Sequence, residues 1–184
     1  MAERVGQSQF AVLGLLSLGP MSGYDLKQLS AWSVGHFWRE GYGQIYPTLR
    51  QLEKERLVTK KTQRQKGKPD RNVYSLTAAG LERLKQWLAL PPNPEVLRNE
   101  LLLKLFFGQW APKEISREHI EAHRQIYKQE LAELAAIRQR LAQEHANDPG
   151  RPFWEMTLSY GEHVSKAQLA WCEETLKKLK AGEK

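Results

Sequence analysis

Residues 43–58 concentrate side chains that can hydrogen-bond to nucleic acid. Gln44, Thr48 and Arg50 offer an amide, a hydroxyl and a guanidinium. These groups can hydrogen-bond the edges of bases in a DNA groove, and arginine and lysine can also neutralise phosphates. Tyr46 adds an aromatic ring. The same residue types are equally compatible with the mixed polar exterior of an ordinary core helix, so the neighbouring sequence decides between the two interpretations.

The apolar residues of this segment predict a short amphipathic helix. Ile45, Leu49 and Leu52 fall at i, i+4 and i+7 and form one apolar stripe. This stripe would anchor the helix to a domain. The hydrogen-bonding side chains, together with Lys54, would then face outward.

A strongly basic β-hairpin is predicted directly after this helix. Segments 58–65 and 71–76 carry strand-forming residues, and a glycine and a proline mark a turn at 66–70. Residues 56–71 contain seven basic side chains and one acid. A helix followed at once by a basic hairpin is typical of a winged helix-turn-helix, in which the helix enters a groove and the hairpin lies against the phosphates. The hairpin residues expected to contact DNA are Arg64, Lys66, Lys68 and Arg71.

The excess positive charge is confined to one half of the chain. Residues 1–92 hold 14 Lys and Arg against 7 Asp and Glu, whereas residues 93–184 hold 14 of each. The net charge of +7 therefore belongs to the half with the predicted helix and hairpin, which indicates double-stranded DNA as its partner. The alternative is a protein-interaction adaptor that keeps the scaffold without reading DNA. The seven-to-one ratio of basic to acidic residues in the hairpin segment argues against that alternative.

The second half of the chain is predicted to be entirely helical. Prolines at 91–94 interrupt the preceding helix, so we place the domain boundary after residue 92. The predicted fold class is mainly α. An N-terminal winged helix-turn-helix with a two-stranded β wing occupies residues 1–92, and an all-α dimerisation domain occupies residues 93–184.

Apolar seams on two long helices, about 112–145 and 153–180, need a partner surface. The helices could pack on each other and on residues 95–108, or pair with a second copy of the chain. We favour homodimerisation, because a two-fold protein suits a pseudo-palindromic site. The residues expected at the dimer contact are Phe106, Phe107, Leu134, Leu141, Leu158, Leu169, Leu176 and Leu179.

Three motifs in this order resemble the PadR family of bacterial transcriptional regulators. They are Pro20-x-Ser-Gly-Tyr-x-Leu26, Gly43-x-Ile-Tyr-Pro-x-Leu-x-x-Leu-Glu53 and Arg71-x-x-Tyr-x-Leu-Thr-x-x-Gly80. They cover about residues 10–90, and residues 97–107 with the helices after them resemble the extended C-terminal dimerisation domain of the larger members. The resemblance implies a homodimeric repressor with a winged-helix reader in each subunit.

The resemblance also assigns positions within that reader. It places Gln44, Tyr46, Thr48 and Arg50 in the recognition helix, and Lys66 and Lys68 at the tip of the wing. Arg56 departs from the pattern, since the family commonly has a glycine there that closes the helix in a left-handed turn. An arginine must either accept strain at this position or end the helix differently.

A small aromatic effector is a further partner suggested by the resemblance. Some PadR-like regulators bind flat aromatic molecules at the dimer centre between aromatic side chains. Trp110, Trp154 and Trp171 are the candidates for that role, and ordinary core or interface tryptophans are the alternative.

The sequence indicates no catalysis, no cofactor and no metal site. It contains no nucleophile–base arrangement or phosphate loop, and His119 and His123 stand at i and i+4 without a further ligand nearby. The single cysteine, Cys172, excludes an intramolecular disulfide and fits a reducing compartment. No apolar run reaches the roughly 20 residues of a membrane helix, and the first residues lack the apolar core of a signal peptide. The predicted location is the cytoplasm.

Overall fold

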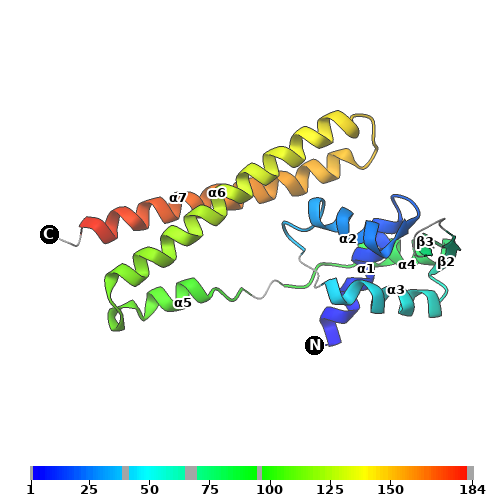
Figure 1. The fold of residues 1–184 in the computed structure, drawn as a ribbon, viewed down its shortest axis with the longest axis horizontal. Coiled ribbons are helices and arrows are strands. Elements are labelled where there is room, and N and C mark those ends of the chain that lie inside the picture. The colour runs from blue at the N-terminus through cyan, green and yellow to red at the C-terminus, as the bar shows by residue number, and fades with distance from the viewer. Residues whose placement is uncertain (1, 39–41, 65–69, 95–96, 182–184) are drawn as a thin grey trace. The chain divides into compact units, whose positions relative to one another are not determined.

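The computed structural model describes residues 2–38, 42–64, 70–94 and 97–181, which belong to two compact units divided between residues 94 and 95 (Figure 1). The sequence places this division two residues earlier. The first unit combines helices with a small antiparallel sheet, and the described part of the second contains helices alone. The predicted fold class, mainly α with a β wing in the first half, is confirmed.

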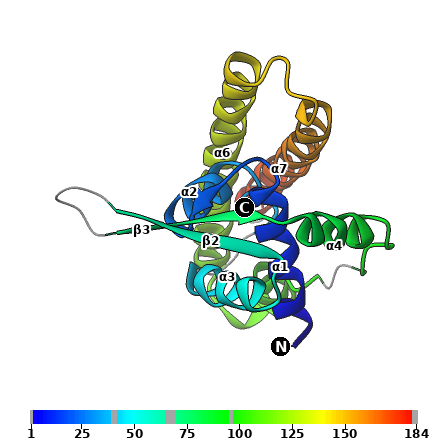
Figure 2. The ribbon, with the colours of Figure 1, turned by 90° about the vertical axis from the view of Figure 1, so that its right-hand side faces the viewer.

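The first unit is built from four described helices and a short sheet. The helices are α1 (Ala2–Leu16), α2 (Gly23–Trp32), α3 (Ile45–Lys54) and α4 (Ala78–Leu88), and a 3-10 turn, η1 (Tyr42–Gln44), leads into α3. The strands are β1 (Met21–Ser22), β2 (Val58–Gln63) and β3 (Arg71–Leu76), antiparallel in the order β1-β3-β2. Figure 2 shows β2 and β3 extending as a hairpin away from these helices.

The sheet has one strand more than the two-stranded wing that the sequence predicts. β1 pairs with β3, with Met21 opposite Tyr74 and Ser22 opposite Val73. Two residues are too few for an alternating pattern to reveal a strand. The pairing also depends on a partner strand far along the chain, so the local sequence gave no signal for it.

One hydrophobic core holds the first unit together. It takes apolar side chains from helices and strands alike, and burying each contributes about 1.5–3 kcal/mol. The core fastens α3 through one side and the hairpin through its base. Its members include Leu13, Leu26, Leu49, Leu52, Val58, Tyr74 and Leu84.

Local hydrogen bonds determine where α2 and α4 begin. Ser22 and Asp25 form a capping box, since the Ser22 N–H donates to the Asp25 carboxylate (2.8 Å) and the Asp25 N–H donates to the Ser22 hydroxyl (3.3 Å). Thr77 caps α4 by accepting from the Gly80 N–H (3.0 Å), and its own hydroxyl donates to the Leu57 carbonyl (2.9 Å). A Cβ on Gly80 would stand 2.1 Å from that carbonyl oxygen, so only glycine fits.

The second unit is a long helical hairpin with a short helix against one end. It comprises α5 (Glu100–Phe106), the 3-10 turn η2 (Gly108–Trp110), α6 (Lys113–Glu144) and α7 (Arg151–Ala181). α6 and α7 run antiparallel side by side (Figure 1). Leu101 of α5 packs with Ile120 of α6 and with Cys172 and Leu176 of α7. Within the described ranges, no helix has both the length and the apolar character needed to cross a membrane.

Half of the residues assigned to the dimer contact are buried within a single chain. Leu134, Leu141 and Leu158 form a buried cluster between α6 and α7, and Leu176 belongs to the cluster with Leu101. Within one chain the two seams complement each other, and an Arg138–Glu162 ion pair (2.8 Å) also joins the helices. Leu169 and Leu179 are partly buried, whereas Phe106 and Phe107 are exposed.

Candidate nucleic-acid interface

Helix α3 presents a hydrogen-bonding surface opposite its buried side. Ile45, Leu49 and Leu52 are buried, as their spacing predicts. The exposed side chains include those of Gln44 at the entry to the helix, Tyr46 and Arg50 along it, and Lys54 in its last turn. The amide, the guanidinium and the aromatic ring are therefore available to a ligand that approaches this side of α3.

Thr48 does not belong to this surface. Its side chain is only 9% exposed, which corrects the prediction that it faces outward with Tyr46 and Arg50. Thr48 stands three residues after Ile45 and four before Leu52, and residues at these spacings share one side of a helix. The polar residue type suggested exposure, but the spacing places Thr48 on the core side.

The Tyr46 ring lies against the first turn of α2. A Cβ added to Gly23 would stand 2.6 Å from Cε1 of Tyr46, so the ring rests on the bare backbone of that glycine. Tyr46 nevertheless remains 54% exposed. Gly23 was not singled out from the sequence as a site residue, although it lies in the first family motif. Its contribution is to let the ring approach.

The wing adds basic side chains beside α3. Lys60 on β2 forms an ion pair with Glu53 of α3 (3.3 Å), which links the wing to the helix. Lys61 and Arg64 are exposed on the same hairpin. Lys61 was not singled out from the sequence as a site residue. It is adjacent to Lys60, and successive side chains of a strand point to opposite faces, so the two lysines have different surroundings. The predicted contacts Lys66 and Lys68 lie outside the described residues.

Arg71 has a different environment from the other predicted wing contacts. It begins β3, and its guanidinium donates a hydrogen bond to the carboxylate of Asp25 on α2. The side chain is therefore engaged within the protein, and it connects the tip end of the β2–β3 ladder to the helix-turn-helix. The sequence offered no indication of this partner, because Asp25 is already accounted for by the capping box.

The end of α3 shows how an arginine replaces the family's glycine. Arg56 adopts a left-handed conformation with φ of 58°. Its N–H donates to the Glu53 carbonyl (3.0 Å), and the Leu57 N–H donates to the Leu52 carbonyl (2.9 Å). These two bonds are the Schellman arrangement that usually closes a helix on glycine. Of the two alternatives for Arg56, the helix thus keeps the family's ending and the arginine accepts the strain.

The three candidate effector tryptophans lie in different surroundings. Trp154 packs in the cluster of Leu158, and Trp171 packs in the cluster of Cys172. Trp110 is 83% exposed on η2. The structure of one chain does not bring these three rings together.

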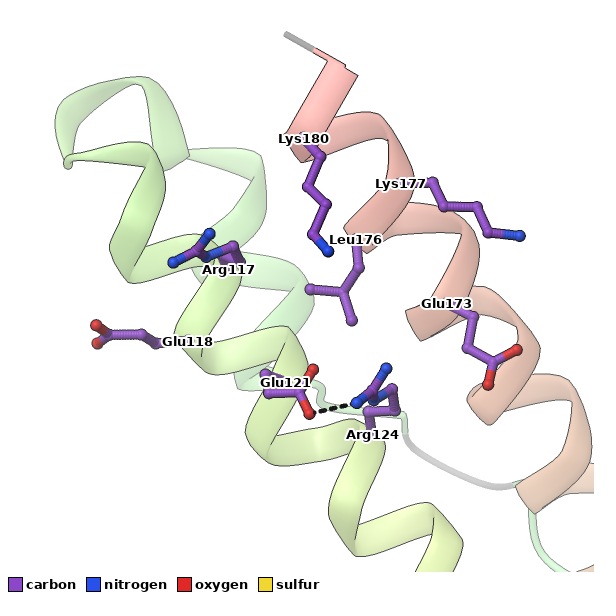
Figure 3. Close-up of a pocket in the computed structure, with 8 residues that line it drawn as sticks. All are labelled: Arg117, Glu118, Glu121, Arg124, Glu173, Leu176, Lys177 and Lys180. Atoms are coloured by element: carbon purple, nitrogen blue, oxygen red, sulfur yellow. Dashed lines mark hydrogen bonds and ion pairs between the residues drawn. The ribbon is translucent and has the colours of Figure 1, made fainter. Parts of the chain in front are cut away.

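A cleft between α6 and α7 is lined mostly by charged side chains. Leu176 and Lys180 point into the space between the helices, whereas Glu118 and Lys177 point away from it (Figure 3). Arg124 is paired with Glu121 across 2.7 Å. None of the residues that line the cleft is aromatic, so a flat ring would find no aromatic stacking partner there.

A helix anchored by its apolar side next to an extended basic hairpin defines the winged helix-turn-helix class. Residues 12–86 match the Transcriptional regulator PadR-like family, and residues 97–180 match the family described as Virulence activator alpha C-term. The Negative transcriptional regulator PadR of Bacillus subtilis (strain 168) is 31% identical over 134 residues, which are 72% of this chain and 74% of that relative. The chain belongs to the PadR-like family of transcriptional regulators, which are DNA-binding proteins and not enzymes.

Solved structures of the Bacillus subtilis relative resemble the chain over nearly its full length. PadR in complex with operator DNA has a TM-score of 0.78 and 28% identity, covering 93% of this chain and 98% of that one. PadR in complex with p-coumaric acid has a TM-score of 0.70 and 26% identity, covering 94% of each chain.

Proposed function

We propose that the chain is a cytoplasmic, homodimeric repressor that reads a pseudo-palindromic operator and is released by a small aromatic effector. The observation that carries the DNA-reading part is the surface of α3. Tyr46 and Arg50 are exposed beside a basic hairpin, while the opposite side of the helix is buried. The relative whose structure contains operator DNA supports the same role.

The proposal divides the DNA contacts between the helix and the wing. Gln44 and Arg50 can donate hydrogen bonds to base edges, and Tyr46 can make apolar contacts, so α3 would determine sequence preference. Lys54 and Arg64, together with Lys66 and Lys68 at the predicted tip, would neutralise phosphates and bind all sequences similarly.

Fluorescence anisotropy of labelled duplexes from the region upstream of this chain's gene tests the DNA-reading role. We expect the logarithm of the binding constant to fall linearly with the logarithm of salt concentration, by about 0.9 for each phosphate neutralised. Arg50→Ala should reduce the preference for operator over scrambled DNA. Arg64→Ala should weaken both about equally. A binding constant that does not change with salt would overturn the proposed phosphate contacts.

A dimer contact is proposed at α5 and η2 in the second unit. Phe106 is 81% exposed and Trp110 is 83% exposed, and Leu103 and Phe107 nearby in the sequence are exposed as well. Large exposed apolar side chains grouped in one segment often mark an interaction site. A second copy of the chain is the proposed occupant, because a pseudo-palindromic operator requires two readers related by two-fold symmetry.

Light scattering coupled to size-exclusion chromatography tests this contact. The Phe106→Ser variant should shift the chain from dimer to monomer without loss of helical circular dichroism. Phe153→Ser is the matched control, since Phe153 is also an exposed phenylalanine but lies on α7. Dissociation by the control substitution alone would place the contact elsewhere.

Repression and effector release are supported by the relatives' names. The related PadR is a negative regulator, and one of its structures contains p-coumaric acid. Residues 97–180 match a domain named for a virulence activator, so the experiment must distinguish repression from activation. A reporter gene behind the operator should be repressed by the chain and released by added p-coumaric acid. Increased reporter expression without the acid would show activation instead.

Trp110 is the proposed effector contact among the three candidate tryptophans, because its ring is exposed. Quenching of tryptophan fluorescence by p-coumaric acid should be reduced in Trp110→Phe. Trp171→Phe, which replaces a partly buried indole, is the control and should leave the quenching largely intact. If p-coumaric acid quenches neither the wild type nor the variants, this molecule is not the effector.

A further inference from the structure

The Asp25 carboxylate joins two structural elements. Its Oδ2 accepts hydrogen bonds from the N–H and the hydroxyl of Ser22 (2.8 and 2.9 Å), which begin α2, and from the Arg71 guanidinium, which begins β3. Partial burial acts to raise the pKa of Asp25, but the bonds from Ser22 and Arg71 outweigh burial and lower the pKa. The carboxylate therefore stays ionised at neutral pH and keeps Arg71 as its partner.

This ion pair continues a contact that the strands make for only two residues. β1 pairs with β3 at Val73 and Tyr74 and then ends. Arg71 lies two residues further along β3 toward the hairpin tip, on the same face of the pleat as Val73. On the other side of β3, Arg71 is paired with Gln63 of β2, which is the last pair of the β2–β3 ladder before the turn. The contact with Asp25 thus holds the free edge of β3 beyond the end of β1.

The same turn of α2 also supports α3. The Tyr46 ring rests on Gly23, which lies between Ser22 and Asp25 in the first turn of the helix. The first turn of α2 therefore contacts the exposed aromatic ring of α3 through Gly23, and the tip end of the β2–β3 ladder through Asp25. A change in this turn would be transmitted to both.

We propose that Arg71 is a positioning residue, which together with Asp25 fastens the wing to the first turn of α2 and so sets the direction of the wing relative to α3. This role rests on the proposed DNA binding, and it replaces the direct phosphate contact expected from the sequence. A guanidinium paired with a carboxylate forms a nearly neutral unit, which attracts a phosphate only weakly. Arg71 acts on DNA through the geometry of the wing.

Salt-dependent DNA affinities of full-length variants distinguish a positioning residue from a phosphate contact. For Arg71→Met we expect an affinity lowered about three- to fivefold at every salt concentration, with the slope of the salt dependence unchanged. Asp25→Asn should produce the same change, and the double variant should bind no more weakly than either single variant. Arg71→Lys, which retains the charge, should recover part of the affinity.

Arg64→Met is the matched control, because Arg64 is an exposed arginine on the same hairpin. Its loss should reduce the salt slope by about 0.9, the signature of one phosphate contact. If Arg71→Met reduces the slope in the same way while Asp25→Asn leaves the affinity equal or higher, Arg71 is a direct contact and the positioning role is overturned.

Thermal unfolding of the wild type, both single variants and the double variant separates this inference from the proposed function. Coupled effects of the two substitutions are expected with or without DNA. A wild type that binds no duplex would overturn the proposed function, even if residues 25 and 71 are coupled in unfolding. Additive effects of the two substitutions, with DNA binding intact, would overturn the positioning role alone.

Discussion

The two units of the chain use their apolar residues differently. In the first unit, side chains from helices and strands converge on one core. In the second unit, the buried residues form two separate small clusters along the α6–α7 hairpin, and large apolar side chains on α5, η2 and the start of α7 are exposed. The first unit thus gathers its buried apolar residues in one core, although Leu88 and Leu90 remain exposed, whereas a single copy of the second unit leaves Phe106 and Trp110 more than 80% exposed.

This difference shows when the spacing of apolar residues in a helix is enough to predict the surface against which the helix packs. The stripe on α3 has one neighbouring core to pack against, so the buried side follows from the spacing. The seams on α6 and α7 fit each other and could also fit a second copy, and the spacing alone does not choose. The seams pair within the chain, and the bulky side chains of Phe106 and Trp110 at α5 and η2 are exposed.

The largest expected effect compares one buried leucine from each unit. Leu49 is 0% exposed and Leu134 is 2% exposed. Leu49→Ala should lower the free energy of unfolding by about 3–5 kcal/mol, and Leu134→Ala by about 2–3 kcal/mol, because a small cluster between two helices can collapse onto the cavity more easily. Urea unfolding monitored by circular dichroism measures both. A greater loss for Leu134 would contradict the contrast between the two cores.

A backbone contact in the first unit should produce the next largest effect. Gly80→Ala should lower the free energy of unfolding by about 2–3 kcal/mol, since the added Cβ would meet the Leu57 carbonyl that Thr77 holds in place. Gly43→Ala is the control, because nothing lies within 4 Å of a Cβ there. Equal urea midpoints for the two variants would mean that the turn before α4 moves freely.

Acid should weaken an ion pair in each unit. Partial burial acts to raise the pKa of Asp25, but the hydrogen bonds from Ser22 and Arg71 outweigh it and lower the pKa. The hydrogen bond from Arg138 lowers the pKa of Glu162. A carboxyl whose pKa is lower in the folded state stabilises that state above its ordinary pKa, and this contribution is lost as the pH falls through the folded-state value.

Asp25→Asn and Glu162→Gln should therefore destabilise the chain most near neutral pH. Their differences from the wild type should shrink once the pH falls below about 4. Urea midpoints across a pH series measure this change. A difference that grows with acidity would show that these carboxyls do not have lowered pKa values.

The smallest effect is expected at the end of α3. Arg56→Gly should raise the free energy of unfolding by about 0.5–1 kcal/mol, because glycine adopts the left-handed conformation without a Cβ clash, although it gains more freedom in the unfolded chain. Thermal unfolding resolves a change of this size. Arg64→Gly is a control in the same unit. Arg64 does not have a positive φ, so its replacement by glycine should not stabilise the chain.

Local signals explain what could be predicted from the sequence. The capping box of Ser22 and Asp25, the cap at Thr77 and the basic hairpin each depend on residues close together in the chain, and each is present. The spacing of Thr48 from Ile45 and Leu52 also indicates that it is buried, whereas its polar residue type wrongly suggested that it is exposed.

Long-range pairings explain what could not be predicted. The strand at residues 21–22 exists only because β3 lies beside it. The partner of Arg71 is a carboxylate in another helix, so its sequence neighbours describe it as one more basic wing residue. These features depend on three-dimensional proximity, which no local pattern encodes.

The burial of Cys172 has a practical consequence for chemical labelling. It is the chain's only cysteine and is fully buried beside Ile120, and burial raises the pKa of its thiol. A buried, protonated thiol reacts slowly with alkylating reagents. A single cysteine introduced at Arg64 would therefore take up a fluorophore selectively in the otherwise unaltered protein, and the later reaction of Cys172 would record when the helical hairpin opens.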